Sequence, residues 1–324
     1  MTTIEIEAEP GEDARQIRLH AIQLATLRPL AALAFDLFVQ RDRQSNPILY
    51  RQRNLPLTQE DINRLVEAQT EHLYITDLGC LRYEQYLGDN LDYFIENEAT
   101  PLKIRFKFLH DAAAALLRPA LQVIRLEPTL RAASRLARQI VPLVQGRSMT
   151  PSRLHDLLRR DARLVTHLVN VACYGVLLAE RCGVRDERRL EEVALGGLLH
   201  DVGLRDLAGP IPDRADMSDV ELDLWRRHPQ SGYELLHRQK ELSNGQLMMV
   251  YQHHERMDGS GFPVRVPGEE MHWLARVCAV VETFDAHTSP QGARKGLVLC
   301  DAMDYLRREA GALFDKELAQ CWTS

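Results

Sequence analysis

From about residue 126 to residue 324, apolar side chains recur every three or four positions, and this helical spacing is the strongest constraint on what the chain can fold into. With 324 residues, of which 45% are hydrophobic, the chain is long enough for two domains that each bury a core. We therefore predict a mainly α protein in which residues 126–324 form a helical bundle. The predicted helices are Leu130–Leu143, Ser152–Arg159, Val165–Arg181, Arg188–His200, Asp219–Gln239, Gln246–His253, Met271–His287 and Leu297–Glu309.

The residues before position 126 show a different pattern, in which short strand-like runs accompany helical stretches. Three runs suit strands, and one helix lies between the last two. The strands are Leu33–Val39, Ile48–Arg51 and His72–Ile75, and the helix is Thr58–Gln69. Thr58 followed by Asp61 is typical of a capped helix start. This order predicts a small α/β domain over residues 16–125.

Two further predictions concern the ends of this small domain. Residues 1–15 form a polar stretch that we expect to be a disordered tail. A helix over Phe106–Leu117 is expected to continue through Ala120–Ile124, with Pro119 kinking or breaking it. The domain carries no cofactor motif, so a role in regulation, packing or dimerisation is expected, and a homodimer is compatible with it.

Charge and cysteine usage narrow the class of protein. The formal net charge of -6 gives no field that would gather a nucleic acid polymer or an anionic membrane. No apolar run approaches the ~18 residues needed to cross a bilayer, and the start of the chain does not resemble a secretion signal. The six cysteines form no CxxC pair, which is typical of a reducing compartment. These observations predict a soluble cytoplasmic protein.

Histidines and acids follow one another along the helical region in an order that suggests a metal centre. The set comprises His167, His200, Asp201, His228, His253, His254 and Glu282. His200 and Asp201 directly follow the apolar run Val193–Leu199. We therefore expect the end of this helix to place an imidazole and a carboxylate together in a buried cavity. Such a buried pair needs a partner, and a divalent metal supplies one. Iron, manganese or zinc suit mixed histidine and carboxylate ligands better than magnesium, which prefers oxygen.

An ordinary structural role remains open for single members of this set. A histidine within a helix, such as His167, is most often a hydrogen-bonded core or surface residue, and Glu282 alone would be an ordinary acid. The adjacent pair His253 and His254 is harder to explain as core filling, because a glycine turn at Asp258-Gly259 breaks the helix end directly beside it.

Four short motifs stand in a fixed order along the helical region. They are Leu198–Gly203, His228–Gly232, His253–Pro263 and Phe284–Ser289. In that order they resemble the LLHDIG, HPxxG, HHExxDGxGYP and FDALTS motifs of the HD-GYP family of cyclic-di-GMP phosphodiesterases, with Phe262 in place of the tyrosine. The resemblance covers roughly residues 126–324. It implies an all-helical HD-type domain that acts as a metal-dependent phosphohydrolase.

By motif position, the resemblance implies that all seven side chains of the set ligate a dinuclear or trinuclear centre, often of iron or manganese. It makes His200 and Asp201 the catalytic pair, with Asp201 as the bridge between two metals. Glu282 stands where the family usually has aspartate. Arg163 stands where the family has the acid that holds a third metal, so we expect two divalent ions, of iron or manganese in preference to zinc or magnesium.

Positions that contact substrate in the family have changed more than the ligands have. Leu204 replaces a lysine that contacts phosphate, and Gln291 and Ala293 replace an arginine and the tyrosine of a DRPYR segment. The candidate substrate-binding residues that remain are Arg294, Lys295, Gly261, Phe262 and Pro263.

Three functions stay open at this point. The first is a phosphodiesterase acting on cyclic-di-GMP or a related cyclic or linear dinucleotide, which explains why the ligand set persists. The second is a catalytically weak or inactive signalling or scaffold protein, which keeps metal as a structural element and binds a protein partner through its Gly-Phe-Pro loop or leading domain. It explains the changed substrate positions. The third is hydrolysis of an unrelated phosphoester.

Overall fold

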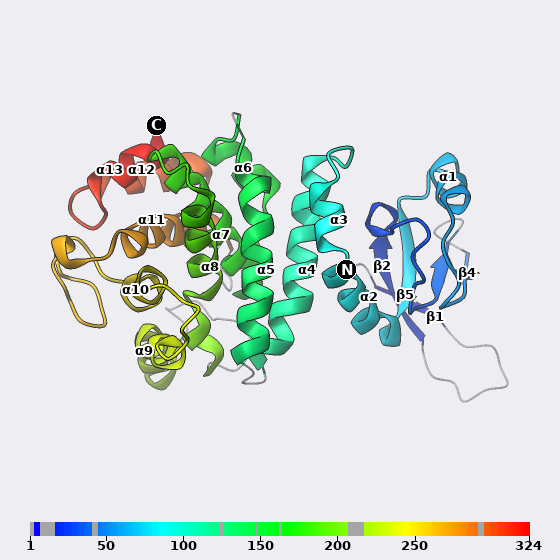
Figure 1. The fold of residues 1–324 in the computed structure, drawn as a ribbon, viewed down its shortest axis with the longest axis horizontal. Helices are drawn as coiled ribbons and strands as arrows, with labels where there is room; N and C mark the ends of the chain where they lie inside the picture. Colours follow the sequence, from blue (N-terminus) through cyan, green and yellow to red (C-terminus); the bar gives the residue numbers. More distant parts are fainter. Residues whose placement is uncertain are drawn as a thin grey trace. The chain divides into compact units, whose positions relative to one another are not determined.

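The structure is a computed structural model that describes residues 3–6, 17–40, 45–122, 126–146, 148–161, 164–206, 217–290 and 295–324. The chain divides into two compact units, residues 1–116 and 117–324. The division falls inside helix α4 (Leu102–Gln122), upstream of the boundary predicted at residue 126. The predicted class, a helical bundle preceded by a small α/β domain, is confirmed (Figure 1).

The leading unit contains a five-stranded sheet in the order β1-β2-β5-β3-β4. All neighbouring strands run antiparallel. The strands are β1 (Thr3–Ile6), β2 (Ile17–Gln23), β3 (Leu37–Val39), β4 (Ile48–Arg51) and β5 (His72–Thr76). The unit also contains the helices α1 (Gln59–Glu67), α2 (Asp77–Asp89) and α3 (Leu91–Glu96) and the part of α4 up to residue 116. Leu19, Leu37 and Leu73, one from each of three adjacent strands, are fully buried in its core.

Local sequence patterns correctly predicted some of the strands and helices of this unit. The strands β4 and β5 and the capped helix α1 are confirmed. The run Leu33–Val39 is a strand only at its end, in β3. The predicted disorder of residues 1–15 is wrong for Thr3–Ile6, which forms β1. That strand exists because its backbone pairs with Ile17–Gln23, a partner that local composition does not reveal.

The helical unit follows from the apolar spacing of the sequence. Its helices are α5 (Leu126–Val144), α6 (Pro151–Leu157), α7 (Leu164–Arg181), α8 (Glu187–Leu199), α9 (Asp219–Leu236), α10 (Asn244–Gln252), α11 (Trp273–Thr288), α12 (Leu299–Arg308) and α13 (Lys316–Thr323). Each of the eight predicted helices appears with ends shifted by a few residues, and α13 was not predicted. The helix α4 continues past Pro119 to Gln122, so a break at that proline is wrong.

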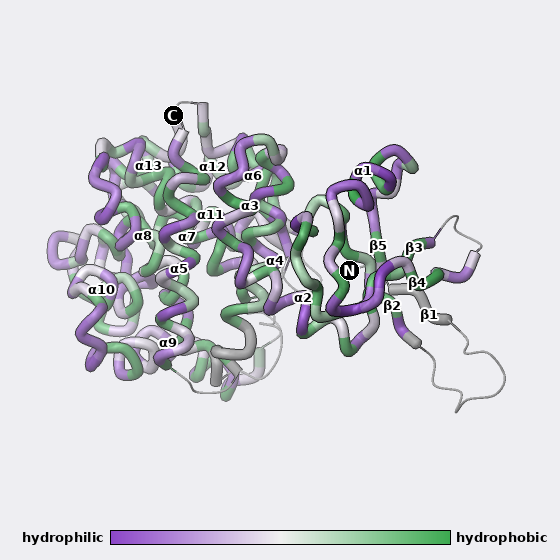
Figure 2. Tube along the Cα trace, turned by 45° about the vertical axis from the view of Figure 1, so that its right-hand side comes forward, coloured by the Kyte–Doolittle hydropathy of each residue, from purple (hydrophilic) through white to green (hydrophobic). Residues whose placement is uncertain are grey.

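The helix α7 forms the centre of this unit. It packs against α5, α8 and α11, and Figure 1 shows α5, α7 and α8 side by side. Most of its residues are apolar and buried, so its tube is largely green in Figure 2. Close approach to α8 depends on Gly197, where an added Cβ would lie 2.7 Å from Cα of Ala172. This packing brings His167 on α7 beside the end of α8 at His200.

A second close approach fixes the segment that follows α8. The short 3-10 helix η2 (Val202–Asp206) packs on α9. A Cβ at Gly203 would lie 2.1 Å from the carbonyl oxygen of His228, so only glycine fits there. The contact holds Asp201 against α9. Within the described part of the chain, no helix has the length and apolar character that a bilayer span requires.

Candidate metal centre

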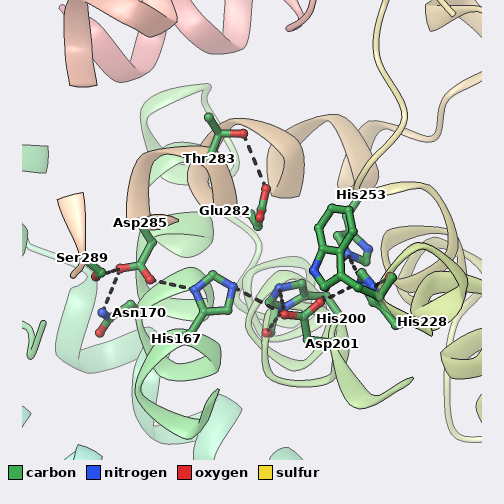
Figure 3. A network of polar contacts seen from close by, with 12 residues as sticks. His167, Asn170, His200, Asp201, His228, His253, Glu282, Thr283, Asp285 and Ser289 are labelled. Carbon is green, nitrogen blue, oxygen red and sulfur yellow. Dashed lines mark hydrogen bonds and ion pairs between the residues drawn. The ribbon is translucent and has the colours of Figure 1, made fainter. Parts of the chain in front are cut away.

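Five helices of the C-terminal unit direct imidazole and carboxylate groups toward one buried point (Figure 3). His167 comes from α7, the pair His200 and Asp201 follows the last turn of α8, His228 comes from α9, and His253 and His254 follow α10. All of them except His167 are buried, and His167 is partly buried. The helix α11 closes the site with Glu282 and Asp285.

The carboxylate of Asp201 lies at the centre and uses its two oxygens separately. Its Oδ2 lies 3.6 Å from Nε2 of His167 and 3.5 Å from Nε2 of His200. Its Oδ1 lies 3.0 Å from Nε2 of His228 and 3.4 Å from Nε2 of His253. Two compact groups of potential ligands therefore share Asp201, and His254 belongs with the second group.

Backbone carbonyls fix the orientation of three of these imidazoles. Nδ1 of His200 donates to the carbonyl of Gly197 at 2.8 Å, and Nδ1 of His253 donates to that of Val250 at 2.9 Å. Nδ1 of His228 donates in the same way to the carbonyl of Trp225. Each bond joins a histidine to the residue three positions earlier. A proton held at Nδ1 leaves a lone pair on Nε2, which faces the site and can bind a metal.

A carboxylate holds the remaining imidazole. Nδ1 of His167 lies 2.7 Å from Oδ2 of Asp285, so that His167 bridges Asp285 and Asp201 in Figure 3. Asp285 is 2% exposed, and its other oxygen accepts a hydrogen bond from Nδ2 of Asn170 at 2.8 Å. Neither Asp285 nor Asn170 was predicted as a site residue. The available signal was the spacing of Asp285, three positions after Glu282 on one helix face.

The electrostatic environment favours the protonation states that metal ligands require. Burial lowers the pKa of His200 to about 3, so its imidazole is neutral at pH 7. Burial also lowers the pKa of His254. For Asp201, burial alone would raise the pKa, but the imidazoles of His200 and His228 outweigh it and hold the pKa well below its usual range. Asp201 is therefore ionised.

His167 differs from the other imidazoles because it faces two carboxylates. Burial lowers its pKa, yet the hydrogen bond to Asp285 and the charges of Asp285 and Asp201 outweigh burial and raise the pKa to about 9. A positive charge is thus stabilised at this place. A bound metal ion would provide that charge at Nε2 in place of the proton.

The arrangement of unpaired groups fits a bound cation. Nε2 of His200 is buried and makes no hydrogen bond within the described part of the chain. Nε2 of His228 and Nε2 of His253 lie 3.0 Å apart although both imidazoles already hold a proton at Nδ1. Facing lone pairs in a buried place are costly without a cation between them. Imidazole and carboxylate donors together suit divalent transition metals.

Comparison with known families agrees with this geometry. The pattern that describes the HD domain matches residues 147–318, more than half of the chain. The chain belongs to the HD domain family. Membership implies divalent metal binding, and the predicted resemblance to HD-GYP proteins is confirmed.

Two curated relatives of this HD domain are bacterial enzymes by name. The chain is 34% identical to cyclic di-GMP phosphodiesterase PA4108 of Pseudomonas aeruginosa over 164 residues. This matched stretch covers 49% of this chain and 39% of that protein. It is 32% identical over 173 residues to the cyclic di-GMP phosphodiesterase response regulator RpfG of Xanthomonas campestris. This match covers 51% of this chain and 44% of that protein. The chain thus spans less than half the length of either relative.

A solved structure resembles the chain over nearly its whole length. It is Bd1817, an HDG"Y"P protein from Bdellovibrio bacteriovorus, with a TM-score of 0.66 and 20% sequence identity. The likeness covers 94% of this chain and 98% of that one. At this identity, the likeness shows that the two proteins share a fold that includes the leading unit as well as the HD domain.

Glu282 takes a different position from the other predicted ligands of the HD domain. It is 7% exposed and lies on α11 beside the cluster, but it belongs to neither compact group. Its Oε2 instead lies 3.5 Å from the hydroxyl of Thr283. Its charge still contributes to the raised pKa of His167, so it acts within the same electrostatic environment.

The Gly-Phe-Pro loop, Gly261–Pro263, lies against the second group of the HD domain. The ring of Phe262 stacks on His254 with 4.7 Å between ring centres and contacts Trp225 at 5.2 Å. Gly261 is buried against the backbone of Glu255. The carboxylate of Glu255, itself fully buried, accepts hydrogen bonds from two backbone N–H groups just beyond Pro263. Phe262 therefore packs against a candidate ligand.

The remaining substrate-binding candidates lie elsewhere or outside the described residues. Lys295 is exposed beside a surface pocket that His155 and Arg160 also line, beyond the end of α11. Leu204 is 3% exposed and packs as a core residue. The positions Arg163, Gln291, Ala293 and Arg294 lie outside the described residues.

Proposed function

We propose that the HD domain of this chain is a metal-dependent phosphodiesterase that hydrolyses cyclic-di-GMP or a related dinucleotide. One observation carries the proposal: the two oxygens of Asp201 face two different pairs of imidazole Nε2 atoms. A shared carboxylate between two sets of donors is suited to two ions. The printed names of the two curated relatives support the choice of substrate class.

The two ligand groups divide the predicted residues between two ions. His167, His200 and Asp201 would hold one ion, and Asp201, His228, His253 and His254 would hold the other. When bound, divalent ions acidify water and stabilise the negative charge of a leaving oxygen. Glu282 is buried beside both groups and would complete the set by a side-chain rotation. We propose iron or manganese as the metal.

The chain's own residues keep this site ready for metal and substrate. Asp201, at the end of α8, would supply one carboxylate oxygen to each ion, and His200 stays neutral beside it. Asp285 holds the proton at Nδ1 of His167, so Nε2 of that imidazole remains the donor. Phe262 covers His254 and limits the access of water to the second group.

Metal content and hydrolysis test the proposal together. The purified chain, loaded with Mn²⁺ or with Fe²⁺ under reducing conditions, should contain close to two ions and cleave cyclic-di-GMP or its linear product. The double change His253→Ala with His254→Ala should remove at least one ion and abolish cleavage. The exposed His237, which follows the last residue of α9, serves as the control, because His237→Ala should keep both properties. Unchanged metal content in the double variant would refute the ligand assignment.

A metal-retaining scaffold protein remains the second candidate, and the burial of Leu204 favours it. At a position that is 3% exposed, Leu204 offers no charge to a substrate phosphate. A lost charge-assisted contact costs about 1.5–3 kcal/mol, so weak hydrolysis is expected even from an active enzyme. Binding of cyclic-di-GMP by the two-metal protein without any turnover would favour the scaffold.

A further inference from the structure

A pair of cysteines in the C-terminal unit has no part in the function proposed above. Cys182 directly follows α7, and Cys321 lies on α13. Both line one open pocket of about 940 Å³, and both are partly exposed. None of the candidate metal ligands lines this pocket. Among the neighbouring side chains, Cys321 acts most strongly on the Cys182 thiol, so the two cysteines are neighbours in this pocket.

The backbone around Cys321 is anchored to the end of α7. Nε of Arg181 donates a hydrogen bond of 2.8 Å to the carbonyl of Cys321. The next side chain, Trp322, is fully buried, with its ring centre 5.4 Å from that of Tyr174 and 5.1 Å from that of Phe284. These contacts hold α13, which carries Cys321, against the end of α7, which Cys182 follows.

We propose that Cys182 and Cys321 form a modification site, which a hydroperoxide oxidises to a disulfide that joins α13 to α7. In the first step, the hydroperoxide R'OOH transfers one oxygen to a thiol, which becomes a sulfenic acid, and leaves as R'OH, which is water when the oxidant is hydrogen peroxide. In the second step, the other thiol attacks that sulfur, the S–S bond forms and a water leaves. The two thiols together lose two protons and two electrons, and the peroxide takes up both.

The environment of the pair makes this a slow reaction. Burial and the contact with Cys321 raise the pKa of the Cys182 thiol to about 12, although the guanidinium of Arg181 acts in the opposite direction. A thiol reacts through its thiolate, which is scarce at neutral pH under these conditions. The pair is therefore suited to a stabilising cross-link under sustained oxidation and unsuited to rapid sensing of peroxide.

The cross-link would act on the helices that carry the candidate metal centre. It closes a loop of roughly 140 residues. A cross-link over a loop of this length strongly lowers the entropy of the unfolded chain and so stabilises the folded state. It also fastens Trp322 against Phe284, which precedes Asp285 on α11. We expect the melting temperature of the C-terminal unit to rise by roughly 5–10 °C on oxidation.

Peptide mapping of the oxidised full chain tests the proposal without any substrate. The protein is treated with hydrogen peroxide, remaining thiols are alkylated, and the digest is analysed by mass spectrometry. A linked Cys182–Cys321 peptide pair should appear, together with the rise in melting temperature, and dithiothreitol should reverse both. Cys182→Ser and Cys321→Ser should lose both effects. Cys300→Ser is the matched control, because Cys300 is exposed on α12 and should not matter.

Two results would overturn this inference. One is oxidation that yields no linked peptide in the unmodified chain and instead gives sulfinic or sulfonic acids at either position. The other is a linked peptide that leaves the melting temperature unchanged. Because both results are read in the unmodified chain, they do not depend on whether a serine variant folds.

Discussion

Among single residues, Asp285 shapes the candidate metal centre from outside the proposed ligand set. It holds Nδ1 of His167 at 2.7 Å and is itself fixed by Asn170. We predict that Asp285→Asn lowers metal affinity roughly 10–100-fold, because loss of an outer carboxylate weakens the imidazole it orients. The loss should fall on the ion held by His167, His200 and Asp201. Titration with Mn²⁺, followed by metal analysis after dialysis, measures it.

The exposed acid Asp304 on α12 provides the control for this change. Asp304→Asn also removes one negative charge, but it leaves His167 untouched and should keep both ions. Equal metal affinity of the Asp285→Asn variant and the wild type would show that this carboxylate is not needed to orient His167. A fall in the stability of the metal-free protein alone would indicate a purely structural role.

Among single elements, the helix α1 depends on the buried carboxylate of Asp61. Thr58 and Asp61 form a reciprocal capping box, and Asp61, which is 3% exposed, also pairs with Arg51 on β4. We predict that Asp61→Ala lowers the free energy of unfolding of the leading unit by about 1–2 kcal/mol at pH 7. Urea unfolding followed by circular dichroism measures this loss. Glu60→Ala, an exposed change in the same turn, should have little effect.

The same carboxylate sets the pH dependence of this unit. Burial alone would raise the pKa of Asp61, but hydrogen bonds from Thr58 and the charge of Arg51 outweigh it and lower the pKa. The stabilisation is therefore complete above the unfolded value of about 3.9 and is lost as the pH falls through the lower folded value. The difference between wild type and Asp61→Ala should shrink below about pH 4. A difference that stays constant down to that range would contradict the assignment.

In the whole molecule, we predict that metal removal lowers the thermal stability of only one of the two compact units. Ligand binding stabilises the folded state by about 2.7 kcal/mol at a concentration one hundred times the dissociation constant. Chelation should therefore lower the melting temperature of the C-terminal unit by roughly 5–10 °C per ion and leave the leading unit unchanged. All three tryptophans, Trp225, Trp273 and Trp322, lie in the C-terminal unit, so their fluorescence follows that unit alone.

Far-ultraviolet circular dichroism, which reports on both units, gives the comparison. Two transitions should separate on adding a chelator, and only the one seen by tryptophan fluorescence should move. A variant that lacks one ligand group, such as His253→Ala with His254→Ala, should show a smaller chelator-induced shift in melting temperature than the wild type. Equal shifts in both transitions would contradict independent unfolding of the two units.

The sequence by itself determined the helices and the order of the metal-binding side chains. Helical spacing is a local property, so eight helices of the C-terminal unit could be predicted. The pair His200-Asp201 and the pair His253-His254 are local as well, because each follows the end of one helix. The sequence also showed, through four short motifs, the family to which the helical region belongs.

Only the tertiary structure decided which groups meet. His167 and Asp285 lie 118 positions apart, and nothing in either segment alone indicates that they share a hydrogen bond. The same holds for Thr3–Ile6, which becomes a strand only by pairing with Ile17–Gln23, and for the thiols of Cys182 and Cys321. Leu204 could be noticed as a missing lysine, but its burial was not visible. Long-range contacts depend on how helices and strands pack, and packing is set by the whole chain at once.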